Sequence, residues 1–491
     1  MSEMSEYEET YREIPPTGVK MQILEERLLN KAAEKARNIQ QNWGDRIRDE
    51  ITTAIYRHAE KISGDVVSAG KEKTSNRNKI IEIDDIVTSR ALGFPLMLFL
   101  LCFIFWLTIY GANYPSDLLS GLFSHLENLL SRFFSLLNSP EWLHDLIVLG
   151  IFRSLVWVVS VMLPPMAIFF PLFTLLEDLG YLPRVAFNLD KLFKLAGAHG
   201  KQALTMAMGF GCNAAGIIST RIIESPRERM IAILTNNYVP CNGRFPLLLA
   251  VSSLLMGAGI ALSPGSLGSL SAAGLVVLLV VFSIMVSLFV SWTLSKTLLK
   301  GVPSSFTLEL PPYRKPQVLQ VLIRSIFDRT IFVLFRAIIV AAPAGAIIWI
   351  AANVSIGGES ILHHVAAWLN PFGSAIGLDG YILLAFILGL PANEIVIPIL
   401  MMSYLSTGTM LEISSLNAVK ELLIEQGWTW VTALNMMLFS LLHFPCGTTL
   451  LTIFKETGSY KWTAAAALIT TFTAVLICFL VYRCAMLMNV L

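Results

Sequence analysis

Charged residues are scarce in this chain. Lys, Arg, Asp and Glu make up 14% of the 491 residues, whereas hydrophobic residues make up 55%, and the mean hydropathy is +0.64. A globular protein of this length could not cover its surface with so little charge, so the composition predicts an integral membrane protein in contact with membrane lipid. The net charge of +1 offers no basic surface for a nucleic acid, and we expect no nucleic-acid partner.

Cysteine is also rare, which excludes the disulfide framework of a small secreted protein. The six cysteines are Cys102, Cys212, Cys241, Cys446, Cys478 and Cys484. A phosphate-binding loop is missing as well. Gly70-Lys71 comes nearest to one, but Asp65 stands where that loop needs its first glycine. Glu72 stands where it needs a hydroxyl, so we expect this chain to bind neither GTP nor ATP by that motif.

Almost half of the charge lies in the first 90 residues. This segment holds 32 of the 71 charged residues, so residues 1–90 are predicted to form a soluble helical segment in the cytoplasm. Its first 16 residues are acidic and polar, which is not the pattern of a signal peptide. Five apolar residues recur every four positions among charged neighbours, as on an amphipathic helix. They are Ile39, Trp43, Ile47, Ile51 and Ile55. Their apolar face packs either on a neighbouring helix such as 21–36 or on a second protein.

Six apolar stretches follow that are long enough for seven membrane crossings of roughly 20 residues each. They lie in Leu92–Tyr110, Leu146–Leu176, Met230–Ser295 (two crossings), Ala337–Gly358, Gln426–Phe454 and Trp462–Tyr482. Two further apolar segments, Ala203–Thr220 and Gly380–Leu411, are interrupted by Gly, Pro, Asn or Cys. The pattern predicts an all-α polytopic membrane protein.

Basic residues are concentrated in one set of loops, which predicts the orientation in the membrane. The basic loops are 184–201, 221–229, 296–329 and 455–461, whereas 111–145, 257–272 and 353–379 together contain one basic residue, Arg132. We expect the basic loops and the N-terminus to be cytoplasmic. Both ends of Ala203–Thr220 then lie inside and both ends of Gly380–Leu411 outside. The two segments are therefore expected to be re-entrant hairpins that enter from opposite faces.

The two interrupted segments resemble each other at an offset of 180 residues. The matching pairs are Gly200/Gly380, Gly209/Gly389 and Asn213/Asn393, and each segment precedes a Pro-Cys pair, Pro240-Cys241 or Pro445-Cys446. With three crossings in each half, this predicts an inverted repeat, the plan of many secondary transporters, whose broken helices meet near the membrane midplane. The residues expected to shape the hairpins and the pathway are Gly209, Gly211, Asn213, Pro240, Asn393 and Pro445.

Side chains able to bind a metal ion lie at or after these breaks. Irregular backbone at membrane depth is tolerated where it lines a cavity or is buried in protein, so we place the site there. The candidate ligands are Cys212, Cys241, Glu394, His443 and Cys446. Thiol, carboxylate and imidazole groups together suit a divalent transition metal better than Mg²⁺ or Ca²⁺.

These candidates also have structural explanations. A membrane cysteine is more often a packing residue than a ligand; we place three in that class, Cys102, Cys478 and Cys484. His443 could hydrogen-bond a backbone carbonyl, and Arg244 could extend to the interface or pair with Glu394. Glu394 is the hardest to explain in this way, because a lone carboxylate at membrane depth is costly and usually faces a pathway.

At these residues the sequence resembles the membrane domain of the FeoB ferrous-iron transporters, from about Asp85 to the C-terminus. The similar motifs are LEDLGYLPR at Leu176–Arg184, GFGCN at Gly209–Asn213, PCNGRFP at Pro240–Pro246, and Pro445-Cys446 followed by ETGS at Glu456–Ser459. The resemblance implies Fe²⁺ as the substrate, no permanently bound cofactor, and transport rather than enzymatic activity. Three features depart from the family pattern: there is no GTPase domain, Asn393 replaces a lysine, and Ala214-Ala215 replaces Val-Pro.

The resemblance implies a multi-pass ferrous-iron permease of the prokaryotic inner membrane whose G-protein subunit is a separate chain. A small FeoA-like cytoplasmic protein and further copies of the chain are other implied partners. The expected domains are the cytoplasmic segment 1–90, the first transmembrane helix with an external loop at 91–145, Gate-like repeats at 146–300 and 331–491, and a cytoplasmic linker at 301–330. Two alternatives are a Gate-type carrier of a nucleoside or other small solute and a membrane interaction protein that transports nothing.

Overall fold

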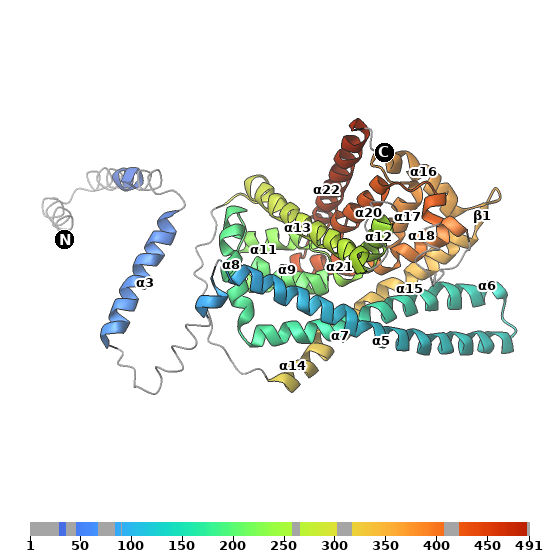
Figure 1. Cartoon of the computed structure of the whole chain (residues 1–491), viewed down its shortest axis with the longest axis horizontal. Coiled ribbons are helices and arrows are strands. Elements are labelled where there is room, and N and C mark those ends of the chain that lie inside the picture. The colour runs from blue at the N-terminus through green and yellow to red at the C-terminus, as the bar shows by residue number, and fades with distance from the viewer. Residues whose placement is uncertain are drawn as a thin grey trace, which may run out of the picture. The chain divides into compact units, whose positions relative to one another are not determined.

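The computed structural model describes residues 29–35, 46–66, 84–89, 91–257, 266–301, 317–406 and 422–488. Almost all of these residues are helical, and the only sheet among them is the hairpin of β1 (Ser355–Ile356) and β2 (Glu359–Ser360). The predicted all-α class is confirmed. The chain divides into two units, Met1–Asn76 with Val302–Thr307 and Arg77–Gly301 with Leu308–Leu491 (Figure 1).

In the first unit, the described residues form a short helix at 29–35 and the helix α3 (Arg46–Val66). The apolar stripe predicted from the sequence continues on α3, where Ile51 and Ile55 are exposed. Ile39 and Trp43 lie outside the described residues. The choice between a neighbouring helix and a second protein as the partner of this stripe stays a prediction.

The second unit contains the apolar part of the chain. Its first half consists of α5 (Gly93–Leu136), α6 (Glu141–His144), η1 (Asp145–Phe152), α7 (Arg153–Asp178), α8 (Tyr181–Leu195), α9 (Gln202–Gly211), α10 (Asn213–Ser219), η2 (Thr220–Ile222), α11 (Pro226–Thr235), η3 (Asn236–Tyr238), η4 (Asn242–Arg244), α12 (Phe245–Gly257) and α13 (Ser266–Lys296). Its second half consists of α14 (Val318–Arg324), η5 (Ser325–Ile331), α15 (Phe332–Asn353), α16 (Ile361–Ala375), α17 (Gly380–Leu388), η6 (Asn393–Ile395), α18 (Val396–Leu405), α20 (Trp430–Leu442), α21 (Gly447–Thr457) and α22 (Tyr460–Leu487).

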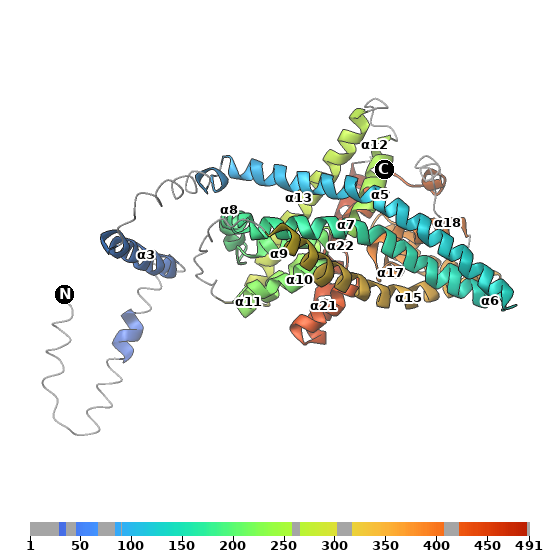
Figure 2. The ribbon, with the colours of Figure 1, turned by 90° about the horizontal axis from the view of Figure 1, so that it is seen from below.

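The segment expected to be an external loop at 111–145 is mostly helical. α5 continues to Leu136, and the chain returns through α6 and η1 into α7, which packs along α5 (Figure 2). Half-buried residues recur every three or four positions on α5, among them Leu119, Phe123 and Leu130. This spacing forms a helical face toward η1 and α7, both of which contact α5. The Arg153 Nη2 atom, 2.5 Å from Glu127 Oε1, ties the two helices together.

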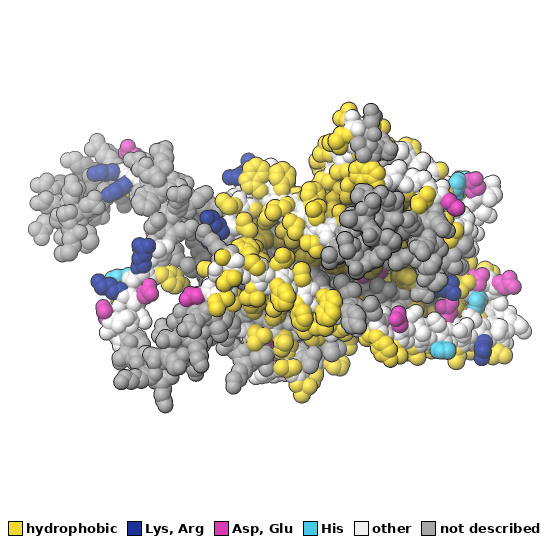
Figure 3. Space-filling view, viewed as in Figure 1, with side chains coloured by type: hydrophobic (Ala, Val, Ile, Leu, Met, Phe, Trp, Pro, Cys, Tyr) yellow, Lys and Arg dark blue, Asp and Glu magenta, His cyan; other side chains and the backbone are white. Residues whose placement is uncertain are grey.

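Among the described residues, fewer helices have the length and composition of a membrane span than the seven crossings that the sequence predicts. Four runs qualify: Glu141–Asp178, Gly274–Lys296, Trp430–Thr457 and Tyr460–Leu487; the pair Ile361–Ala375 and Gly380–Leu388, bent by 111°, would make a fifth. Two of the other expected crossings correspond to shorter apolar helices, Gly93–Thr108 and Ile338–Asn353. Hydrophobic side chains dominate the face of this unit seen in Figure 3, as lipid contact requires.

Both interrupted segments fold back on themselves. Gly216 of α10 lies so close to α9 that a Cβ there would be 2.8 Å from the Thr205 carbonyl oxygen. In the second segment the Tyr381 and Tyr404 rings, from the two ends of the segment, are 5.4 Å apart. The breaks at Cys212 (φ −155°, ψ 127°) and Ala392 (φ −153°, ψ 127°) share one backbone conformation. These residues are 180 positions apart, the predicted offset of the repeat.

The basic loops of the two halves meet at one end of the unit. Arg221 and Arg229 lie 2.6 and 2.7 Å from the carboxylate of Glu456, which belongs to the last turn of α21 in the second half of the chain. Arg227 donates a hydrogen bond to the Leu299 carbonyl. In Figure 1, α8, α9 and α11 lie on one side of the unit, and α16, α17 and α18 lie on the other. The two hairpins therefore belong to different sides of the unit.

Candidate functional site

Four interruptions of helical backbone come together inside the second unit. Two are the hairpin breaks at Cys212 and Ala392, and two are the helix breaks at the Pro-Cys pairs. Within the second repeat, the Gly447 N–H donates a 2.6 Å hydrogen bond to the Leu390 carbonyl. Between the repeats, η4 packs on η6. The site is therefore assembled from both halves of the chain, as the inverted-repeat plan predicts.

The Pro-Cys pairs break their helices because proline cannot donate a backbone hydrogen bond. Cys241 (φ −80°, ψ 166°) and Cys446 (φ −62°, ψ 159°) follow the prolines in extended conformations. The carbonyl groups released by the first break are satisfied from α13, where Ser283 donates to the Tyr238 oxygen and Ser287 donates to the Thr235 oxygen at 3.3 Å. Irregular backbone is stable at this depth because such partners replace water.

Glu394 lies where the two repeats touch. A Cβ on Gly243 would overlap its carboxyl group, so the absence of a side chain at Gly243 makes the space that this carboxyl group occupies. Trp157 of α7 donates to the Glu394 carbonyl oxygen at 3.3 Å. The neighbouring Asn393 places its amide nitrogen 3.8 Å from the sulfur of Cys241. The second hairpin break thus faces the first Pro-Cys pair.

The three candidate thiols lie in the same region of the unit as this contact. Cys212 lies within electrostatic range of both Cys241 and Cys446, and Glu394 lies within the same range of Cys241 and Cys446. All three cysteines have free thiols, and the sulfur of Cys446 is 3.1 Å from the hydroxyl of Thr449. In this conformation, no three His, Cys, Asp or Glu side chains within the described ranges are arranged to hold one metal ion. Their roles as ligands stay predictions.

His443 is held by its backbone neighbours. Its Nδ1 lies 3.0 Å from the Phe439 carbonyl oxygen and 2.9 Å from that of Ser440. Because both neighbours can only accept, Nδ1 carries the proton, which leaves Nε2 as the nitrogen able to bind a metal. The ring is 1% exposed and packs against Phe386 and Phe444 at 4.9 Å each. The hydrogen bond to a carbonyl, which the sequence left as an alternative, is present.

Arg244 neither extends to the interface nor forms an ion pair with Glu394, although both residues are described. It is fully buried, and its Nη1 donates to the carbonyl oxygens of Asn237 and Leu441 at 2.9 and 2.7 Å. Asn237 is a residue that the sequence did not single out. Its amide nitrogen donates to the His443 carbonyl oxygen at 2.7 Å, so it joins the two helix breaks. Gly243 and Trp157 were also missed, since nothing in their local sequence reveals a distant contact.

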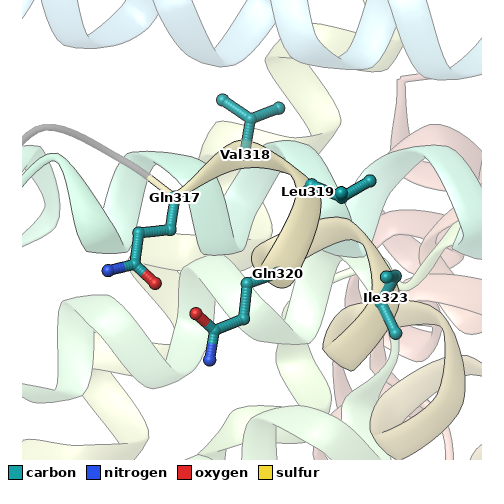
Figure 4. A pocket seen from close by; sticks show the side chains of 5 residues that line it. All are labelled: Gln317, Val318, Leu319, Gln320 and Ile323. Atoms are coloured by element: carbon teal, nitrogen blue, oxygen red, sulfur yellow. The ribbon is translucent and has the colours of Figure 1, made fainter.

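A depression elsewhere on the second unit contains none of these residues. Its lining, shown in Figure 4, consists of Gln317, Val318, Leu319, Gln320 and Ile323 at the start of α14. Leu319 is 73% exposed. The depression is therefore an open surface feature, and the candidate site is the buried meeting point of the four breaks.

Comparison with known proteins relates this chain to two families. The Gate family model, described as nucleoside recognition, matches residues 159–255 and 334–460, and the model described as ferrous iron transport protein B C terminus matches residues 276–328. The Gate matches contain all five candidate ligands and both Pro-Cys pairs. No solved structure matches the chain.

The names of three similar curated proteins all contain Fe(2+) transporter FeoB. The Fe(2+) transporter FeoB of Staphylococcus aureus (strain MSSA476) is 29% identical over 449 residues, covering 89% of this chain and 63% of that protein. The protein of that name from Methanocaldococcus jannaschii is 27% identical over 428 residues, covering 84% and 60%. An Fe(2+) transport protein A/Fe(2+) transporter FeoB fusion protein of Porphyromonas gingivalis is 29% identical over 450 residues, covering 82% and 51%. The chain spans less than two thirds of the length of these relatives.

Proposed function

We propose that this chain, which is related to the FeoB iron transporters through their Gate-containing portion, is a permease that carries Fe²⁺ across the prokaryotic inner membrane. The observation that carries the proposal is the contact between the repeats at Gly243 and Glu394, with Cys241 and Cys446 in electrostatic range of the carboxylate. A carboxylate and thiols at a buried break are the groups that a dehydrated, borderline-soft dication needs.

In this proposal, Glu394 and the three cysteine thiols together replace the water molecules around the ion. Glu394 supplies the negative charge that makes a dication tolerable at depth, and the thiols of Cys212, Cys241 and Cys446 supply soft ligands. Deprotonation of a thiol accompanies strong binding, so a proton leaves as the ion enters. Because Glu394 comes from one repeat and Cys241 from the other, a shift of the repeats would separate the ligands and release the ion.

A carrier of nucleosides or other small solutes is the second candidate, since the description of the Gate family model refers to nucleoside recognition. A nucleoside requires hydrogen-bonding and stacking partners and has no need of three thiols near a half-buried carboxylate. A membrane interaction protein without cargo, the third alternative, would not need Glu394 at all. The position of Glu394 at the break therefore favours a cation over both.

The orientation and the partners also belong to the proposal. We place the end that carries Arg221, Arg229 and Glu456 in the cytoplasm, because basic loops are retained there. In our proposal, GTP acts through a G protein on a separate chain. One relative is named as a fusion of Fe(2+) transport protein A and FeoB, which supports an interaction with a small FeoA-like protein. Association with further copies of the chain is also part of the proposal.

The test is uptake by proteoliposomes that contain the purified chain, measured with ⁵⁵Fe²⁺ and with radiolabelled uridine in parallel. We expect saturable iron uptake that Glu394→Gln removes without loss of monodisperse protein. The matched control is Glu224→Gln, since the side chain of Glu224 is 73% exposed. Accumulation of uridine, with iron flux unaffected by Glu394→Gln, would replace the iron permease by the solute carrier.

A further inference from the structure

The two Pro-Cys breaks leave backbone carbonyl groups without their helical partners. In an α-helix, the carbonyl oxygen of one residue accepts from the N–H group four residues later. For Leu441 that residue is Pro445, which has no N–H group. For Asn237 it is Cys241, whose extended backbone (φ −80°, ψ 166°) has left the helix. Leu441 and Asn237 are at most 1% exposed, so these carbonyl groups need partners within the protein.

One guanidinium group binds both of these carbonyl groups. Nη1 of Arg244 donates to the Asn237 carbonyl oxygen at 2.9 Å and to the Leu441 carbonyl oxygen at 2.7 Å. Asn237 precedes the Pro-Cys pair of the first repeat, and Leu441 precedes that of the second. Arg244 therefore replaces the missing donor of each break and links the two repeats through a single nitrogen atom.

The side chain of Asn237 adds a second link between the same breaks. The His443 carbonyl group also lacks its helical partner, because the Gly447 N–H donates to the Leu390 carbonyl group of the second hairpin break. The Asn237 amide nitrogen donates to the His443 carbonyl oxygen at 2.7 Å, and its amide oxygen accepts from Nη2 of Arg244 at 3.3 Å. Arg244 and Asn237 form one connected unit, which we call the clamp.

Arg244 is a costly residue in this position. Its guanidinium group is fully buried and donates to neutral oxygen atoms, and its Nε has no hydrogen-bond partner among the described residues. A buried charge without a counter-charge is destabilising, and free carbonyl groups alone do not require one. The hydroxyl groups of Ser283 and Ser287 satisfy other carbonyl groups of the first break without any charge. Only a planar fork of several donors can reach both repeats at once, and arginine supplies it.

We propose that the clamp positions the thiols of Cys241 and Cys446 so that both bind the same Fe²⁺. Each thiol belongs to the residue directly after its proline, so its position depends on the break that the clamp holds. Both cysteines lie within electrostatic range of Arg244. Neither clamp residue touches the ion in this role, since both act through the backbone that carries the ligands. This role rests on the proposed function and deepens it, because it explains how two repeats bring their ligands to one ion.

The clamp also defines what changes when the ion is released. Two of its hydrogen bonds cross between the repeats, from Arg244 to the Leu441 carbonyl oxygen and from Asn237 to the His443 carbonyl oxygen. The bonds between Arg244 and Asn237 lie within the first repeat. A shift of the repeats that separates the two thiols therefore breaks the first pair of bonds and keeps the second.

The test uses Co²⁺ as a spectroscopic probe of the purified full chain in detergent, with the thiols reduced and oxygen excluded. Thiolate bound to Co²⁺ gives a charge-transfer band in the near ultraviolet, whose intensity per bound ion rises with the number of thiolates. Cys446→Ser calibrates the loss of one thiol. Asn237→Ala removes the bond to the His443 carbonyl group. We expect it to lower the band to the level of Cys446→Ser and to weaken Co²⁺ binding roughly tenfold or more.

The matched control is Asn435→Ala in α20. Asn435 is also fully buried, and its amide nitrogen donates to the carbonyl groups of Ile376 and Cys478 at 2.8 and 3.3 Å, all within the second repeat. This variant loses comparable bonds without loosening the contact between the repeats, so it should keep the wild-type band. If Asn237 served stability alone, both alanine variants would have lower melting temperatures and unchanged bands.

Asn237→Asp is a second variant that keeps the shape of the side chain and supports folding through an ion pair with Arg244. Its carboxylate cannot donate to the His443 carbonyl group, so the band should again fall to the level of one lost thiol. A wild-type band in either folded variant of Asn237 would overturn the clamp and leave the iron permease intact. Absence of a thiolate band from the wild-type chain would contradict the proposed iron site and the clamp together.

Discussion

Gly243 and Glu394 are 151 positions apart, yet the carboxyl group of Glu394 occupies the space where Gly243 would carry a Cβ. The contact joins the helix break of one repeat to the hairpin break of the other. Because Gly243 has no side chain, nothing prevents the Glu394 carboxyl group from lying against its backbone. The account of iron transport depends on this contact more than on any other.

Gly243→Ala should therefore impair transport through a single methyl group. The new Cβ forces the Glu394 carboxyl group out of its position, and we expect ⁵⁵Fe²⁺ uptake to fall roughly tenfold or more, equivalent to about 1.4 kcal/mol. Gly274→Ala is the matched control, because a Cβ on Gly274 would meet nothing within 4 Å. Equal uptake by the two variants would show that the position of Glu394 does not matter.

The Pro-Cys thiols give a second prediction. Cys241→Ser and Cys446→Ser keep the size of the side chain but replace a soft ligand by a hydroxyl, so each should lower Fe²⁺ uptake roughly tenfold or more. Cys484→Ser, at an exposed position of α22, should leave uptake unchanged. Since thiols release protons when they bind a metal, wild-type uptake should also weaken as the pH is lowered. Wild-type rates in both serine variants would assign these thiols to packing.

Orientation can be tested by single-cysteine labelling in a chain whose own cysteines have been replaced. Lys194→Cys should react only from the cytoplasmic side, and Glu359→Cys only from the outside. Both side chains are at least 39% exposed, and Glu359 avoids Gly358, whose φ of +95° would strain a cysteine. Labelling of both positions from one side would exclude the predicted topology.

The exposed stripe on α3 predicts a docking surface for the G protein. Ile51→Asp combined with Ile55→Asp should abolish co-purification of a GTP-hydrolysing partner, because an introduced carboxylate cannot enter an apolar interface. Both positions are exposed, so the substitutions should not disturb folding. Gly64→Asp adds a carboxylate to the opposite face of α3 and should keep the partner. Unchanged recovery with the double variant would place the interface elsewhere.

The sequence predicted the positions of the breaks but not how they meet. Gly, Pro and Asn act on the backbone locally, so the breaks at Cys212 and Ala392 and at both Pro-Cys pairs could be located from residue types alone. The contact of Gly243 with Glu394 depends on the packing of two halves of the chain and leaves no local signal. The same holds for Asn237, which gains its partners only when both helix breaks are in place.

At two places the structure differs in detail from what the sequence suggested. Polar residues in 111–136 suggested a loop, although the apolar residues between them have the spacing of a helix that packs on α7. For Arg244 the sequence left open the interface or Glu394, whereas the unwound backbone around it offers carbonyl oxygens that bind the guanidinium inside the protein. A hydropathy pattern contains no information about such carbonyl groups.

The most direct test of the central claim is X-ray absorption at the iron edge, recorded on the purified chain loaded with Fe²⁺ under anaerobic conditions. The account predicts a first coordination shell that contains sulfur together with carboxylate oxygen. The sulfur contribution should be lost from the double variant Cys241→Ser with Cys446→Ser and kept in Cys484→Ser. A shell of oxygen and nitrogen alone in the wild-type chain would contradict iron binding where the two repeats meet.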